Sequence, residues 1–187
     1  MRRAAAVCGL ALLAAGGVLL TEQGWLTAKA CVAEVLIDRA LERHLADGGT
    51  HRPWGWADMH PVATLEAPRL GVRRVVLSGA TGATLAFGAG HVHGTARPNA
   101  RGNCAVAGHR DGRFAFLERL EPGDEIVLRS HSGTMRYEVT ARKVTDRRDA
   151  SVLEPTVTNR LTLITCYPFG GLRRSELRYV VVCERQE

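Results

Sequence analysis

Residues 161–168 read LTLITCYP, an apolar and β-branched run that stops at a thiol and a Tyr-Pro turn. Such a run, bounded by a turn signal, predicts a buried strand. A thiol at the end of that strand has a fixed backbone and an accessible side chain. Cys166 is therefore a candidate nucleophile, provided that a cation or a base supports its thiolate. A buried structural thiol is the alternative interpretation, and the commoner one for a free cysteine.

Two other segments carry groups that suit a nucleophilic thiol. His109 follows a short apolar strand and a glycine in the segment AGHRD, residues 107–111. Histidine is well suited to protonate a leaving amine near neutral pH. Arg178 begins the next strand after Cys166, so a hairpin would bring its guanidinium beside the thiol, where it can hold an oxyanion. A surface histidine and a solvated arginine remain the alternatives.

Strand-like patterns recur along residues 62–187, with Gly and Pro turns between them. The expected strands are 62–67, 72–78, 104–107, 125–130, 135–145, 161–165 and 178–184, with short helical turns within 80–87 and 114–120. Seven or so strands at this spacing predict a compact all-β barrel or sandwich.

The amino terminus has a different character. Residues 4–21, AAAVCGLALLAAGGVLLT, carry no charge and follow Arg2 and Arg3. As a helix they would span about 27 Å, close to a hydrocarbon core of roughly 30 Å. Arginines before the stretch and Glu22 after it predict a cytoplasmic amino terminus. We expect an uncleaved transmembrane anchor over residues 1–27; the alternative is a signal peptide cleaved near residues 28–30, AKA.

The rest of the chain divides into a stalk and a domain. Apolar residues recur at three-to-four spacing over residues 28–45, which predicts a helix that Gly48 and Gly49 end. Residues 51–61 then form a linker, so that 28–61 is the helical stalk and linker, and 62–187 is the catalytic domain. With its anchor in the inner (cell) membrane as a single span, this domain would lie on the extracytoplasmic, periplasmic side.

Composition excludes some functions. The formal net charge is +6, but the 25 basic residues include only two lysines, and the arginines are scattered. This pattern argues against a nucleic-acid partner. The five cysteines are an odd number and have no C-x-x-C pair, so at least one thiol is free and zinc-ribbon spacing is missing.

Taken together, the motifs resemble those of the sortases, cysteine transpeptidases of bacterial surfaces. TLITC at residues 162–166 looks like the family's T-L-x-T-C strand, and AGHRD resembles the segment with the catalytic His. GAGHVHGTA at 88–96, with Pro98 after it, is similar to the G-x-G-H-x-x-G-T-x-x-P run, and RYVVV from Arg178 matches the Arg strand. The resemblance covers about residues 62–184.

Three further tracts look most like the proteobacterial branch called class GN sortases. They are PWGWAD at residues 53–58, AGHRDGRFAFLERLEPGDEI at 107–126 and CYPF at 166–169.

The resemblance implies a closed eight-stranded β-barrel with the three catalytic groups at one end. Cys166 would attack a threonyl–glycyl bond in an LPXTG-like sorting signal and form a thioacyl enzyme. His109 would act as general acid and then as base, and Arg178 would steady the substrate or the oxyanion. Thr165 would hydrogen-bond the substrate, and Arg174, with Arg173, competes with Arg178 for the third role. An amine acceptor would resolve the intermediate.

No cofactor or metal is expected. The acidic loop that binds calcium in some sortases has no clear counterpart here, and His91 and His93 lack a third ligand at useful spacing. Cys104 and Cys183 lie in expected strands and are read as core residues. Two other functions stay open: an exported cysteine peptidase that only hydrolyses, and a β-barrel binding module without catalysis. A papain-like enzyme is disfavoured, because there the Cys precedes the His.

Overall fold

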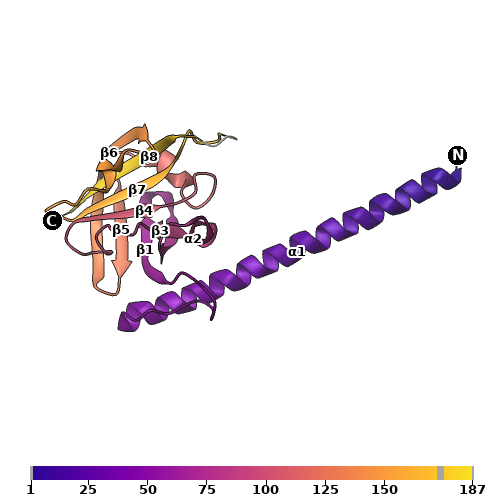
Figure 1. The fold of residues 1–187 in the computed structure, drawn as a ribbon, viewed down its shortest axis with the longest axis horizontal. Coiled ribbons are helices and arrows are strands. Elements are labelled where there is room, and N and C mark those ends of the chain that lie inside the picture. The colour runs from indigo at the N-terminus through magenta and orange to yellow at the C-terminus, as the bar shows by residue number, and fades with distance from the viewer. Residues whose placement is uncertain (1, 172–174, 187) are drawn as a thin grey trace. The chain divides into compact units, whose positions relative to one another are not determined.

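A computed structural model gives the backbone of residues 2–171 and 175–186, and the side chains of residues 23–25, 27–171 and 175–186 (Figure 1). In chain order the elements are α1 (Arg2–Asp47), β1 (Pro61–Ala67), η1 (Pro68–Leu70), β2 (Val72–Ser78), α2 (Gly82–Phe87), β3 (Ala89–His91), β4 (Asn103–Ala107), η2 (Ala115–Arg119), β5 (Glu125–Ser130), β6 (Gly133–Asp146), η3 (Ala150–Leu153), β7 (Arg160–Tyr167) and β8 (Leu177–Arg185), where η marks a 3-10 helix.

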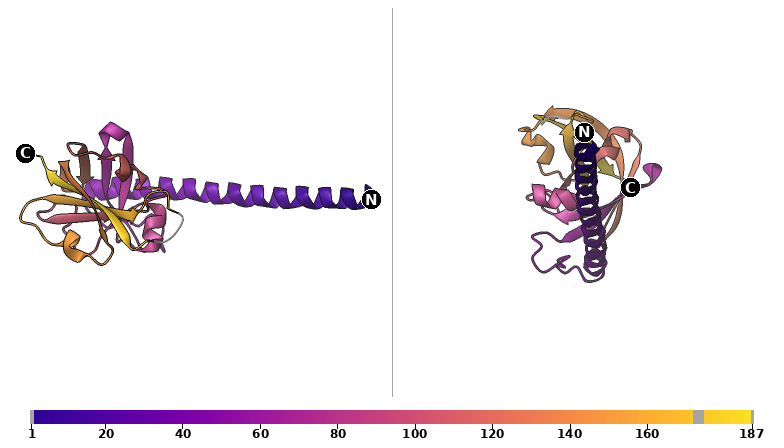
Figure 2. Two further views of the ribbon diagram at one scale, coloured as in Figure 1. Left: turned by 90° about the horizontal axis from the view of Figure 1, so that it is seen from above. Right: turned by 90° about the vertical axis from the view of Figure 1, so that its right-hand side faces the viewer.

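The strands form a closed barrel in the order β1-β2-β3-β4-β7-β8-β6-β5, and the β1–β5 pair completes the ring. The pairs β2–β3 and β4–β7 are parallel and the others are antiparallel. In Figures 1 and 2, β7 and β8 run side by side, coloured orange to yellow. The closed eight-stranded barrel that the resemblance implies is confirmed.

The alternation of buried residues fixes which side chains face the inside of the barrel. On β7, Leu161 and Leu163 are fully buried in the main core, as are Val181 and Cys183 on the paired β8. Side chains alternate between the two faces of a strand. The even-numbered residues of β7 and β8, which include Cys166, therefore point to the outer face of the barrel.

The structure also corrects the strand pattern. The sequence missed β3, because a three-residue strand is too short to show a period. β6 is longer than expected, since its first part pairs with β5 and its later part with β8. β6 begins at Gly133, whose φ of 119° is a backbone conformation that favours glycine.

Helix α1 runs without interruption to Asp47 and ends at Gly48, whose φ is 72° and whose N–H donates to the His44 carbonyl at 2.8 Å. A left-handed glycine of this kind is a common helix terminator. The chain forms two compact units, Met1–Leu36 and Ile37–Glu187. In the second unit, Ile37 of the helix packs in a small core cluster with Met59 and Leu77.

Residues 37–61, expected as stalk and linker, thus contribute to the same compact unit as the barrel. Where side chains are described, no helix has both the length and the apolar character that a membrane span requires. The apolar stretch 4–21, which carries the expectation of an anchor, lies outside the described side chains.

Candidate active site

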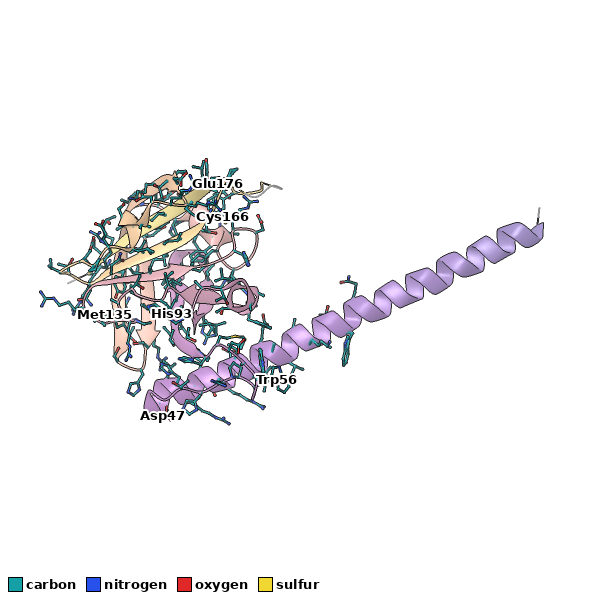
Figure 3. The ribbon with its side chains drawn as sticks, viewed as in Figure 1. Asp47, Trp56, His93, Met135, Cys166 and Glu176 are labelled. Carbon is teal, nitrogen blue, oxygen red and sulfur yellow. The ribbon has the colours of Figure 1, made fainter. Side chains whose placement is uncertain are left out.

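Cys166 and Arg178 are direct partners in the antiparallel ladder between β7 and β8. Residues opposite each other in such a ladder project to the same face, with Cβ atoms about 4.5–5.5 Å apart. Both are half-buried on the outer face of the barrel, and Figure 3 shows Cys166 at the end of its strand. The β7–β8 pairing therefore places Arg178 next to Cys166, on the same face of the sheet.

The guanidinium of Arg178 is held by its own loop. One of its nitrogens donates to the carbonyls of Ser175, at 3.0 Å, and Leu177, at 2.9 Å. Arg173 and Arg174, the competing arginines, lie outside the described residues.

His109 reaches the same end of the barrel through β4. This strand runs parallel to β7, with Ala107 opposite Ile164, and the Gly108 N–H donates to the Ile164 carbonyl at 3.1 Å. His109 follows directly and is exposed, so an imidazole, a thiol and a guanidinium come from the ends of three neighbouring strands.

The turn that bears His109 needs a glycine before it. A Cβ on Gly108 would lie 2.5 Å from the ring of Phe114, which is completely buried. The Phe114 N–H also donates to the His109 carbonyl at 3.0 Å. The aromatic ring thus packs against the backbone of the turn and fixes where the imidazole starts.

The structure corrects the role expected for Thr165. Its side chain is 2% exposed, and its hydroxyl donates to the Gly108 carbonyl at 2.7 Å. A buried hydroxyl that already has a backbone acceptor is poorly placed to bind a substrate. Thr165 therefore ties the Cys166 strand to the His109 turn, which is a positioning role in place of the expected substrate contact.

One charged group near Arg178 escaped the sequence interpretation. Thr145 on β6 is the partner of Arg178 on its other side, and its hydroxyl donates to Asp149 at 2.6 Å. Hydrogen bonds from Ser151 and Thr145 lower the pKa of Asp149 to about 2, so this carboxylate is an anion at neutral pH. The loop sequence offered no signal beyond the Asp-x-Ser pattern of a helix cap.

The two other thiols of the barrel are buried and unreactive near neutral pH. Burial raises the pKa of Cys104 to about 12 and also raises that of Cys183, and both lie in the core as free thiols. Since the thiolate is the nucleophile, neither is available near neutral pH. Cys166 is half-exposed at the rim, which leaves it as the thiol of this barrel that a substrate can reach.

The histidines of the G-x-G-H run do not form a metal centre with other described residues. His91 is buried on β3, with its Nε2 atom 2.8 Å from the Ala96 carbonyl, and burial lowers its pKa. His93 is exposed. Among the residues the structure describes, no three His, Cys, Asp or Glu side chains are grouped so as to hold a metal ion.

The fold and the rim site agree with what is found among known proteins. A family model described as a sortase domain matches residues 65–186, well over half of the chain. The chain belongs to the sortase family. Sortase D of Bacillus subtilis (strain 168) is 30% identical over 122 residues, which are 65% of this chain and 62% of that relative. The match thus spans less than two-thirds of the relative's length.

Solved sortase structures share the fold. A Clostridium perfringens Sortase D5 transpeptidase superposes with a TM-score of 0.69 over 84% of this sortase and 99% of that chain, at 23% identity. Sortase C-1 from Actinomyces oris is 30% identical, with a TM-score of 0.61 over 70% of this chain and 76% of the other. The barrel described above is therefore the sortase barrel.

Proposed function

We propose that this sortase is a membrane-anchored cysteine transpeptidase that cleaves an LPXTG-like sorting signal and transfers the new carbonyl to an amine. The observation that carries the proposal is the direct pairing of Cys166 with Arg178 on the outer face of the barrel, next to the turn that bears His109. Membership of the sortase family and the structural similarity to the Clostridium perfringens Sortase D5 transpeptidase support it.

In the first half-reaction the Cys166 thiolate attacks the carbonyl carbon of the Thr–Gly bond. A C–S bond forms, the C–N bond breaks, and the His109 imidazolium gives its proton to the leaving amine. Arg178, fixed by the carbonyls of Ser175 and Leu177, donates hydrogen bonds to the oxyanion of the tetrahedral intermediate.

In the second half-reaction an amine attacks the thioester carbonyl and gives a proton to His109. A C–N bond forms and the C–S bond breaks, which regenerates the thiolate and the imidazolium. Water in place of the amine would make the enzyme a peptidase. The acceptor therefore decides between the two functions, since both use the same thioester.

The test uses the purified full-length chain, a panel of LPXTG-type peptides and an added amine. Ligation that needs the amine and vanishes in Cys166→Ala, but not in Cys31→Ala, supports the transpeptidase. Cys31 is the matched control because its thiol is free and exposed on α1. Cleavage without ligation indicates the peptidase. With neither turnover nor a thioacyl adduct on Cys166, the chain is a binding module.

We also propose that residues 1–27 anchor the enzyme, with the barrel on the periplasmic side of the inner membrane. The uncharged stretch 4–21 and its continuity with α1 support this arrangement. The protein should then resist alkaline extraction from membranes and keep its full mass. A shortened, soluble product would indicate the cleaved signal peptide.

We further propose that this sortase belongs to class GN. The tracts at residues 53–58, 107–126 and 166–169 support this assignment. The partner would be an exported protein with a C-terminal LPXTG-like signal. We expect no nucleic acid, metal or cofactor in the reaction.

A further inference from the structure

Arg110 is a charged residue that the fold buries. Its side chain is 9% exposed, although it directly follows the exposed His109 in the sequence. Burying a guanidinium is costly unless its N–H groups find acceptors. The acceptors that Arg110 uses therefore show what the burial achieves.

The acceptors lie on the segment that follows the nucleophile. One nitrogen of the Arg110 guanidinium donates to the Pro168 carbonyl at 2.9 Å, and the other donates to the Gly171 carbonyl. Its Nε donates to the carboxylate of Asp111, which is itself exposed. Two of the acceptors are thus main-chain oxygens within five residues of Cys166.

Gly171 leaves room for this contact. A Cβ at this position would lie 3.2 Å from the guanidinium of Arg110, closer than an ordinary van der Waals contact. The segment after Cys166 therefore fits the planar fork of an arginine. Lysine cannot reproduce the contact, because its three N–H donors all lie on one nitrogen.

The opposite flank of the turn is tied as well. Thr165, directly before Cys166, donates to the carbonyl of Gly108, directly before His109. Both neighbours of His109 are thus bonded to the chain on either side of Cys166. These side-chain bonds add to the strand ladder, which ends at Ala107 and Tyr167.

We propose that Arg110 is a positioning residue that holds the His109 turn at a fixed separation from residues 168–171, which follow Cys166, so that acid and nucleophile meet the same scissile bond. The proposal rests on the transpeptidase function above. A catalytic group displaced by about 1 Å can cost about 100-fold in rate. Arg110 acts through His109 and Cys166, and it need not touch the substrate.

The test compares Arg110→Lys, Arg110→Gln and Gly171→Ala in the full-length chain, with Arg101→Gln as the matched control. Arg101 also donates to a distant loop carbonyl, that of Val157 at 2.8 Å, but it precedes β4 and so lies at the opposite end of the barrel. We expect kcat for ligation to fall about 100-fold in the two Arg110 variants. Gly171→Ala, which keeps the guanidinium but crowds it, should show a smaller loss, and Arg101→Gln none.

Two readouts separate positioning from a general structural role. KM should change little, since the step that suffers is chemistry and not binding. The pH profile of Cys166 alkylation by iodoacetamide, followed by peptide mass spectrometry, should differ from that of the wild type as the imidazole moves away. Folding is checked in the same experiment, because the buried Cys104 and Cys183 stay unmodified in a folded barrel.

Folded Arg110 variants with the wild-type kcat and alkylation profile would overturn the proposal. So would a loss that resides in KM while the alkylation profile stays unchanged. If the wild-type chain forms no product and no adduct with any peptide, the proposed function fails instead. The alkylation profiles still decide whether Arg110 holds the two segments together, because iodoacetamide needs no substrate.

Discussion

At the scale of single residues, Arg178 combines two properties that an oxyanion-binding group needs. It is the ladder partner of Cys166, and the carbonyls of Ser175 and Leu177 fix its guanidinium before any substrate arrives. Donors that are fixed in advance stabilise a transition state without reorganisation. Loss of the Arg178 guanidinium should therefore lower the rate of ligation.

We expect Arg178→Ala to lower kcat/KM for ligation by about 100-fold to 1,000-fold, as the loss of a fixed oxyanion donor does in other enzymes. Arg178→Lys should recover little, because the planar fork is lost. Arg185→Ala, at the far end of the same strand, is the control. If Arg174→Ala causes the large loss and Arg178→Ala does not, the third role belongs to Arg174.

Gly108 lies too close to the Phe114 ring to carry a side chain. A methyl group there would meet the buried Phe114 ring at 2.5 Å, so Gly108→Ala must displace the ring or the His109 turn. We expect a destabilisation of about 1–3 kcal/mol, typical of overpacking, together with loss of ligation. The free energy of unfolding in urea measures the first effect.

Gly112, four residues further along the same loop, is the control, since a Cβ there meets nothing within 4 Å. Gly112→Ala should change stability by less than about 0.5 kcal/mol. Equal effects of the two substitutions would show that Phe114 does not constrain the turn.

At the scale of elements, the carboxyl-terminal part of α1 belongs to the same compact unit as the barrel. Leu41 is 1% exposed and Ile37 is 3% exposed, whereas Val35, only two residues earlier, is 51% exposed. Helical periodicity alone had placed all of this region in a stalk. The change in burial along one helix shows where packing against the barrel unit begins.

Leu41→Ala should therefore destabilise the unit by about 2–5 kcal/mol, the usual cost of emptying a buried leucine site. Val35→Ala should stay within about 0.5 kcal/mol of the wild type. Urea unfolding followed by tryptophan fluorescence measures both, because Trp54 packs against the cluster that contains Ile37. Equal stabilities would mean that the helix end is not part of the folded unit.

The sequence predicts the longer strands better than the shortest one. β2 and β5 lie where the alternation places them, at Val72–Ser78 and Glu125–Ser130. The three-residue β3 was missed because its place in the sheet comes from pairing with β2 and β4 and not from a local pattern. Long-range pairing likewise extends β6 beyond the predicted 135–145.

At the scale of the whole molecule, acid should weaken the fold before it protonates most carboxylates. Burial lowers the pKa of both His60 and His91 below 6.5; the charges of His44, Arg52 and His93 add to the effect at His60, and those of His93 and Arg97 at His91. A histidine with a lowered folded pKa binds its proton more readily in the unfolded chain, so stability falls as pH falls.

The directions of these two pKa shifts define the pH range in which stability changes. Above about pH 7.5 both histidines are neutral in either state, and their contribution is constant. Between about pH 6.5 and 5 the unfolded chain takes up protons first, and the free energy of unfolding should decrease. Urea titrations at pH 7.5, 6.5 and 5.5 measure this decrease. His60→Gln should reduce it, and a profile that is flat or rises toward acid would contradict the argument.

From the sequence alone came the candidate reactive groups and the order of the parts: the thiol that ends LTLIT, the histidine after AG, the arginine that opens RYVVV and a β-rich domain. Local patterns suffice for these, since period, turn residues and reactive groups are written along the chain. Tertiary contacts, in contrast, turn Thr165 inward, bury Arg110 against residues 168–171 and pack residues 37–61 into the same unit as the barrel. Each of these depends on pairing between residues far apart in sequence, which no local pattern contains.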